Sequence, residues 1–195
     1  MDSGKLLYRV EVLRPQKTEE TVFYETIKRT WASIELTAGK NLFSAAGLGV
    51  KSAELLVRRQ ELDLHCAFRW RGKHLFLTDI VEEERRYWRL SAARIEPTHC
   101  VAYRISRTLN QRRNPVDKPE KLLEFPGFLT EKFEGYAKEF PMAKKTERII
   151  AVVPKLVELE IGDLVDFGRG RYVVETAYLT DEFKNEYQLS REDDV

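Results

Sequence analysis

The chain has 195 residues, of which 43% are hydrophobic and 33% are charged. This composition allows a packed core and excludes a globally disordered chain. The 33 Lys and Arg residues nearly balance the 32 Asp and Glu residues, and the net charge of +1 lacks the basic excess that is usual in a dedicated nucleic-acid-binding protein.

Alternating apolar and polar residues predict strands at the beginning of the chain. The stretch KLLYRVEVLRP (5–15) shows this period of two, and after a polar connection a second strand continues to Leu36. In that second strand Ala32 and Ile34 share one face. Trp31, a much larger apolar residue, lies on the other face among polar residues, so its position needs an explanation beyond the core of a single subunit.

Residues 37–52, TAGKNLFSAAGLGVKS, are rich in small residues, and we expect a short helix or a flexible loop there. The next segment, 53–70, is typical of a strand, a turn and another strand. The clearest hairpin follows the motif RWRGK (69–73), where Gly72 forms the turn. Its apolar strand HLFLTDIV leads through the charged turn EEERR into the returning strand YWRLSAARI.

The residue pattern of the sequence changes after Pro97. The polar stretch LNQRRNPVDKPEK (109–121) contains two prolines and predicts a linker or a long loop. An amphipathic helix is expected at about 129–140, because large apolar residues recur there at helical spacing. These residues are Leu129, Phe133, Tyr136 and Phe140. Strand patterns return from 147 to the end of the chain.

The second half of the chain repeats motifs of the first. The segments 69–91 and 166–190 both run from an aromatic residue through a Gly turn, an apolar strand and an acidic turn to an aromatic and Leu-Ser. Matching residues lie about a hundred positions apart, the usual size of a small domain. The matching pairs are Gly72 with Gly170, Trp88 with Tyr187, and Leu90 with Leu189. Two tandem units, 1–98 and 99–195, are the economical interpretation, although any two β-meanders share such turns.

The order of motifs in the first unit resembles the phage head–tail joining, or head-completion, proteins. The motifs are an early strand, WASIEL, a short helix, a hairpin around FRWRGKHLFL, and an acidic turn before RYWRL, and they span residues 5–96. This resemblance implies a mainly β protein, with a small β-barrel and one short helix per unit. The second unit lacks a counterpart of WASIE, so its early strands are expected to be rebuilt or missing.

The resemblance also implies a function. Such a protein is made in the bacterial host cytoplasm and becomes a structural part of the virion, as a homo-oligomeric ring of sixfold or twelvefold symmetry at the head–tail junction. Its partners would be the portal or adaptor protein and the tail or tail-terminator protein, with weak contact to packaged double-stranded DNA. The ring would help to close the DNA exit channel and to dock the tail. A tail-completion protein is a related alternative.

Two places in the first unit are candidates for assembly contacts. Trp31, on the outer face of its strand, could anchor the contact between neighbouring subunits, or it could cover the open end of the barrel. The glycines of segment 37–52 permit a change of shape, so this segment could face the channel or a neighbouring subunit, or form an ordinary short helix that caps the barrel. Its candidate contact residues are Lys40, Leu42, Phe43 and Lys51.

No motif for catalysis, a metal or a cofactor is found. The dipeptide HC occurs at 65–66 and 99–100, but adjacent residues on a strand point to opposite faces, and the close spacing of structural zinc sites is missing. Neither cysteine has the local signature of a nucleophile. The motif FGRGR (167–171) lacks the GxGxxG spacing of a phosphate-binding loop. We therefore expect a protein that is not an enzyme and that needs no cofactor.

The cellular setting follows from the cysteines and the N-terminus. Two cysteines, Cys66 and Cys100, are too few for a disulfide framework in a chain of this length, which indicates reduced thiols and an intracellular protein. The first residues contain no apolar signal region, and no apolar run approaches about 18 residues. We expect a soluble protein that does not associate with a membrane.

Arginine-rich motifs favour an alternative function from a different class. The motifs RRQ (58–60), RWRGK (69–73), NQRRN (110–114) and FGRGR (167–171) mix arginine with aromatic residues or glycine. On a small β-barrel, arginines and aromatic rings can bind nucleic acid by pairing with phosphates and stacking on bases. The alternative is therefore a nucleic-acid-binding barrel. The near-zero net charge instead favours the interpretation of these motifs as solvated turns.

Overall fold

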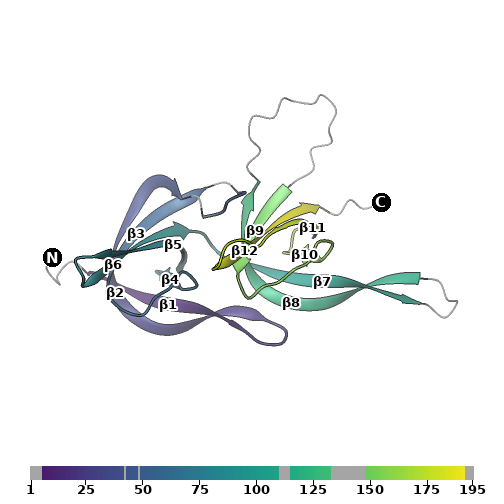
Figure 1. The fold of residues 1–195 in the computed structure, drawn as a ribbon, viewed down its shortest axis with the longest axis horizontal. Helices are drawn as coiled ribbons and strands as arrows, with labels where there is room; N and C mark the ends of the chain where they lie inside the picture. Colours follow the sequence, from purple (N-terminus) through teal and green to yellow (C-terminus); the bar gives the residue numbers. More distant parts are fainter. Residues whose placement is uncertain (1–5, 42, 48, 110–114, 133–147, 192–195) are drawn as a thin grey trace, which may run out of the picture. The chain divides into compact units, whose positions relative to one another are not determined.

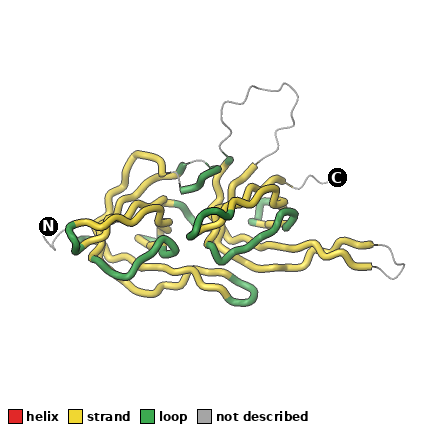
Figure 2. Tube along the Cα trace, viewed as in Figure 1, coloured by secondary structure: helices red, strands yellow, loops and turns green. Residues whose placement is uncertain are grey.

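The computed structural model describes residues 6–41, 43–47, 49–109, 115–132 and 148–191. These residues form twelve strands (Figure 1), and they contain no helix (Figure 2). The chain divides into two compact units. The first unit consists of Met1–Gln16 and Phe23–Pro97, and the second consists of Lys17–Val22 and Thr98–Val195.

Six strands build the barrel of the first unit. They are β1 (Tyr8–Lys17), β2 (Val22–Asn41), β3 (Val50–Arg58), β4 (Ala67–Trp70), β5 (Lys73–Glu83) and β6 (Tyr87–Arg94). Their order around the closed barrel is β1-β2-β3-β6-β5-β4. The strand alternation in the sequence matches this architecture, because a closed barrel buries one face of every strand and exposes the other.

Six further strands build the barrel of the second unit. They are β7 (Thr98–Leu109), β8 (Pro115–Glu131), β9 (Arg148–Pro154), β10 (Leu164–Asp166), β11 (Arg171–Tyr178) and β12 (Lys184–Arg191). Their order is β10-β11-β12-β9-β8-β7, and the barrel is again closed. Closure gives the strands of each barrel wall a neighbour on both sides, which removes an exposed sheet edge there.

The two barrels share one connectivity. Each strand from β1 to β6 has the same neighbours as its counterpart from β7 to β12. Gly72 and Gly170 both lie in the turn before the fifth strand of their unit, with φ angles of 75° and 119° that favour glycine. Leu90 and Leu189 are both fully buried on the sixth strand. The residues that repeat in the sequence therefore occupy equivalent places in the two units.

Each unit has its own hydrophobic core. In the first, Val12, Leu55, Phe68 and Leu90 are among the buried residues of one cluster. The core of the second unit contains buried residues of all six of its strands, and Val22 of the segment Lys17–Val22 also belongs to it. Within this unit, the Glu124 amide donates a hydrogen bond to the Glu20 carbonyl at 2.8 Å.

The prediction of a short helix in each unit is wrong for the described residues. Leu129 and Thr130, at the start of the expected helix, belong to β8 and pair with Ala151 and Ile150 of β9. The helical spacing from Leu129 is therefore overridden by sheet pairing to a distant strand. The rest of that prediction, including Phe133, Tyr136 and Phe140, lies outside the described residues.

The segment 37–52 is also mostly strand. Thr37 pairs with Ser52, and Lys40 with Lys51, at the end of the β2–β3 hairpin. The pairing register shifts between Thr37 and Lys40, and such an irregularity accommodates glycine within a strand. The two ends of the segment are therefore strand, and residues 43–46 of the connection are loop. The expected loop is confirmed for these residues, and the expected helix is wrong for the described ones.

Two predictions about the second unit need correction. Its early strands are neither rebuilt nor missing, because β7 and β8 have the same neighbours as β1 and β2. The expected linker, 109–121, is in large part strand, since Pro115–Lys121 belong to β8 and pair with β7. Pro119 lies opposite Ile105 there, in a two-stranded part of the hairpin where a strand with only one neighbour tolerates proline.

Candidate functional site

The structure of β2 explains why Trp31 lies among polar residues in the sequence. Ala32 and Ile34 point into the barrel and are buried, whereas the side chain of Trp31 is 56% exposed. Trp31 is absent from the core cluster of the first unit. In the structure this tryptophan therefore faces outward and is available for contact with another molecule.

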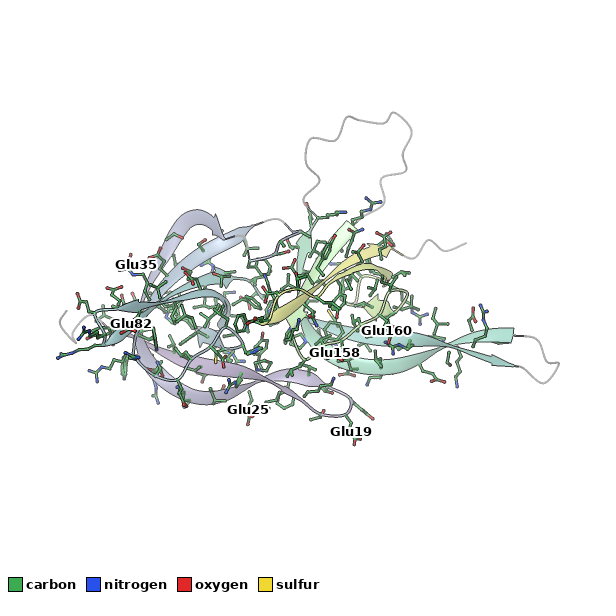
Figure 3. The ribbon with its side chains drawn as sticks, in the orientation of Figure 1. Glu19, Glu25, Glu35, Glu82, Glu158 and Glu160 are labelled. Carbon is green, nitrogen blue, oxygen red and sulfur yellow. The ribbon has the colours of Figure 1, made fainter. Side chains whose placement is uncertain are left out.

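Trp31 has apolar neighbours along the same face. Phe23 and Ile27 are 40% and 42% exposed, and both precede Trp31 at even spacing, which places the three residues on one side of the strand. Charged residues alternate with them: Glu25 and Glu35 project from β2 into solvent (Figure 3). We call Phe23, Ile27 and Trp31 the apolar face of β2. Glu25 and Arg29 separate these three residues along the strand, so they form a spaced row, which is a candidate protein contact surface.

Two of the other candidate residues, in segment 37–52, have described side chains: Phe43 and Lys51. Phe43 is 1% exposed, and its ring packs edge-to-face against Phe76 at a centroid distance of 5.8 Å. Phe43 is therefore buried and is not exposed for contact with a neighbouring subunit. Lys40 and Lys51 are paired in the β2–β3 hairpin, with Lys51 exposed, and Leu42 lies outside the described residues.

The arginine-rich motifs place several guanidinium groups over aromatic rings. Arg71 lies 5.0 Å from the ring centroid of Trp70, and Arg59 lies 5.2 Å from that of Trp88. In the second unit, Arg171 lies 5.8 Å from the ring centroid of Tyr103. Such contacts hold a guanidinium group in place. Arg59 is also paired with Glu82, with 3.1 Å between its Nη1 and the Glu82 Oε1.

The two His-Cys pairs lie in separate units. Burial raises the pKa of the Cys66 thiol, and it raises the pKa of Cys100 to about 12. Both groups stay protonated at neutral pH, and a thiol is a weak nucleophile and a weak metal ligand. In the part of the chain that the structure describes, no three His, Cys, Asp or Glu residues are grouped as metal ligands.

Comparisons with known proteins identify no family for this chain. None of the described residues forms a helix long and apolar enough to cross a membrane. The chain matches no family model, and comparison with curated proteins and with solved structures found no significant similarity. Any function must therefore be argued from the residues themselves and from the resemblance noted in the sequence.

Proposed function

We propose that this protein is a structural, non-enzymatic assembly component that works as a homo-oligomeric ring of the head-completion type. In that role it would join the portal or adaptor to the tail in a virion and help to close the DNA exit channel. The β-barrel expected of such proteins agrees with the fold. Ring partners, symmetry and location in the virion are parts of the proposal.

The observation that carries the proposal is the apolar face of β2. Large exposed apolar side chains cost free energy in water, at about 25 cal/mol per Å² of apolar surface. A neighbouring subunit that covers Phe23, Ile27 and Trp31 would recover this free energy. Tryptophan is also the residue most enriched among the few side chains that dominate interface energies, and Trp31 is the most exposed of the three.

A ring explains how modest contacts suffice. A head-to-tail contact between unlike surfaces repeats around a closed ring when its rotation closes. Each subunit then presents the same portal-binding surface several times, so that weak individual contacts add to an avid one. The mechanism is geometric, and no group of the chain needs to perform chemistry.

The mass of the protein in solution tests this proposal. Native mass spectrometry and light scattering across a concentration series should show a closed oligomer in equilibrium with monomer. Trp31→Ser should weaken the association about 30-fold or more, the effect of losing about 2 kcal/mol at an interface centre. The matched change Val81→Ser, at a residue of the same unit that is 50% exposed, should leave the association constant unchanged.

Two results would contradict the proposal. If the wild-type protein remains monomeric at every concentration, it does not self-associate, and the proposed ring does not form. Equal weakening by Trp31→Ser and Val81→Ser would mean that general surface hydrophobicity, and not the apolar face of β2, drives association. Circular dichroism of both variants verifies that the barrel is intact.

A nucleic-acid-binding barrel is the second candidate function. The guanidinium groups held over Trp70, Trp88 and Tyr103 favour it, because Arg and aromatic pairs on small barrels are suited to nucleic acid. A salt titration of DNA binding distinguishes the two candidate functions. A dedicated binder retains tight DNA binding at physiological salt, with a steep dependence of affinity on salt concentration.

A further inference from the structure

Four arginines gather around one glutamate on the outside of the first unit. They line a shallow groove of about 330 Å³ together with Val10 and Gly72. We call these five charged residues the arginine cluster: Arg9, Glu11, Arg29, Arg69 and Arg71. The cluster carries three more positive than negative charges, although the net charge of the whole chain is only +1.

Strand pairing brings the cluster together from three separate parts of the sequence. Arg9 and Glu11 alternate on the outer face of β1, and Arg69 of β4 lies directly opposite Glu11 in the antiparallel register. Arg29 comes from the outer face of β2, the strand next to β1. Arg71 follows β4 in the turn that leads to β5.

Glu11 organises two of the arginines. Its Oε1 atom accepts a hydrogen bond from Nε of Arg29 at 3.1 Å. The two side chains also form an ion pair, with 3.0 Å between Nη2 of Arg29 and the same oxygen. The Oε2 atom of Glu11 accepts a hydrogen bond from Nη1 of Arg69 at 3.3 Å. A guanidinium has five N–H donors, so Arg29 and Arg69 keep donors that point away from Glu11. Arg9 and Arg71 form no ion pair with any described residue.

The conformation of Arg71 supports a role in binding. Arg71 has a φ of 49° and Gly72 a φ of 75°, and the two residues connect Trp70 to its partner Lys73, as in a two-residue type I′ turn. Asparagine or glycine usually occupies the first position, because positive φ is uncommon for other residues. An arginine there, stacked on Trp70 and 5.5 Å from the ring centroid of Tyr8, is conformationally costly, and such residues concentrate at functional sites.

The chemistry of the cluster indicates its ligand class. Guanidinium groups bind phosphate oxygens through paired, parallel N–H donors, and four of them around a shallow groove suit a chain of phosphates better than a single small anion. Arg71 already stacks on Trp70 and Tyr8, so these rings are not free to stack on bases. Contacts to phosphates alone position a nucleic acid without reading its sequence.

We propose that the arginine cluster binds the sugar–phosphate backbone of a nucleic acid, independently of base sequence. This goes beyond ring assembly, because it assigns a ligand and a face of the first unit to it. Arg29 lies between Ile27 and Trp31 on the same face of β2, so the anion site overlaps the proposed subunit contact at Arg29, whereas Arg9, Arg69 and Arg71 come from other parts of the unit.

Fluorescence anisotropy of the full-length protein with labelled DNA tests the proposal. The double variant Arg9→Gln/Arg71→Asn removes the two unpaired charges, and asparagine preserves the positive-φ turn. Between about 50 and 200 mM salt, we expect the slope of log affinity against log salt to become shallower by about 1 for each arginine removed. Two duplexes of unrelated sequence should lose affinity equally.

The matched control is Arg58→Gln/Arg86→Gln, which removes the same charge from two exposed arginines of the first unit outside the groove. It should retain most of the affinity. Equal losses in both double variants would overturn the proposal, since any surface charge would then serve. Failure of the wild type to bind either duplex or single-stranded DNA at low salt would also overturn it, even if inorganic phosphate binds.

The test is separable from the ring proposal. Trp31→Ser leaves all four arginines in place, so the same titration on this variant shows whether phosphate binding persists without the proposed subunit contact. Retained, cluster-dependent binding in Trp31→Ser supports the site. Loss of cluster dependence in that variant contradicts a site built by one subunit.

Discussion

At the scale of single residues, the most unusual group is a buried histidine of the first unit, on β5. His74 is 5% exposed, and its ring meets that of Tyr24 at a centroid distance of 4.8 Å. Burial, with a smaller contribution from the charge of Arg69, lowers the pKa of His74 to about 3. Burial likewise raises the pKa of Tyr24. Both side chains are therefore neutral at physiological pH, as their burial requires.

Acid should destabilise the first unit through His74. Its folded pKa of about 3 lies below the ordinary value of 6.5, so between these values the unfolded chain binds a proton that the folded chain excludes. The stabilising contribution is complete above pH 6.5 and is lost as pH falls, by about 1.4 kcal/mol per pH unit within the window. Urea unfolding of wild type and His74→Gln at pH 6.5 and pH 4.5 measures this slope.

The variant is expected to show a smaller loss of unfolding free energy between the two pH values, because glutamine has no proton to bind. Carboxylates contribute equally to both proteins and cancel in the comparison. An identical pH dependence in wild type and variant would show that His74 does not titrate differently in the folded state.

At the scale of elements, an Arg–Asp pair fastens the same loop in both barrels. Arg14 of β1 pairs with Asp63, and Arg104 of β7 pairs with Asp163 through two hydrogen bonds of 2.9 and 2.8 Å. Each aspartate lies before the fourth strand of its unit and also accepts a backbone N–H from its own loop. The pair therefore holds the loop against the first strand, and it is a feature that the sequence comparison did not detect.

Loss of the Asp163 charge should cost stability in the second unit. The Asp163 side chain is only 4% exposed, and a hydrogen bond to a charged group contributes about 1.5–3 kcal/mol. Asp163→Asn is expected to lower the free energy of unfolding by that amount. Asp117→Asn is the matched control. The side chain of Asp117 is 56% exposed and that of its partner Arg107 is 76% exposed, and such an exposed pair contributes about 0–1 kcal/mol. Urea titrations followed by far-UV circular dichroism measure both, and equal losses would contradict the explanation.

At the scale of the whole molecule, two barrels with separate cores share one chain. The buried cluster of the first unit and that of the second have no residue in common. All three tryptophans, Trp31, Trp70 and Trp88, belong to the first unit. Tryptophan fluorescence therefore reports on the first barrel alone, whereas circular dichroism reports on both.

Equivalent core substitutions should act on separate transitions. Leu90→Ala and Leu189→Ala each remove a fully buried leucine, at a cost of about 2–5 kcal/mol. Leu90→Ala is expected to lower the urea midpoint of the fluorescence transition. Leu189→Ala should leave that midpoint in place and shift the midpoint seen by circular dichroism. A fluorescence midpoint that moves equally in both variants would mean that the two units unfold as one.

Local patterns in the sequence predicted much of the barrel architecture. Alternation predicted which face of β2 is buried at Ala32 and Ile34, because side chains of a strand point alternately to its two sides. The turn glycines Gly72 and Gly170 marked equivalent hairpins, since their positive φ angles are a local requirement. The exposed position of Trp31 followed from the same alternation.

Long-range pairing decided what local patterns could not. Leu129 fitted a helical stripe as well as a strand, and its pairing with Ala151 of β9 selected the strand, because sheet hydrogen bonds come from distant residues and outweigh local preference. Phe43 looked exposed within a glycine-rich stretch but is buried against Phe76 of β5.

By itself, then, the sequence determined the β class, the tandem units and the outward tryptophan, all of which depend on neighbours along the chain. The arginine cluster depended on the tertiary structure alone. Arg9, Arg29 and Arg69 are far apart in sequence, and only the closed order of β4, β1 and β2 brings their guanidinium groups around Glu11. Charge accumulates at one place on a nearly neutral chain because strand register, and not composition, selects which side chains become neighbours.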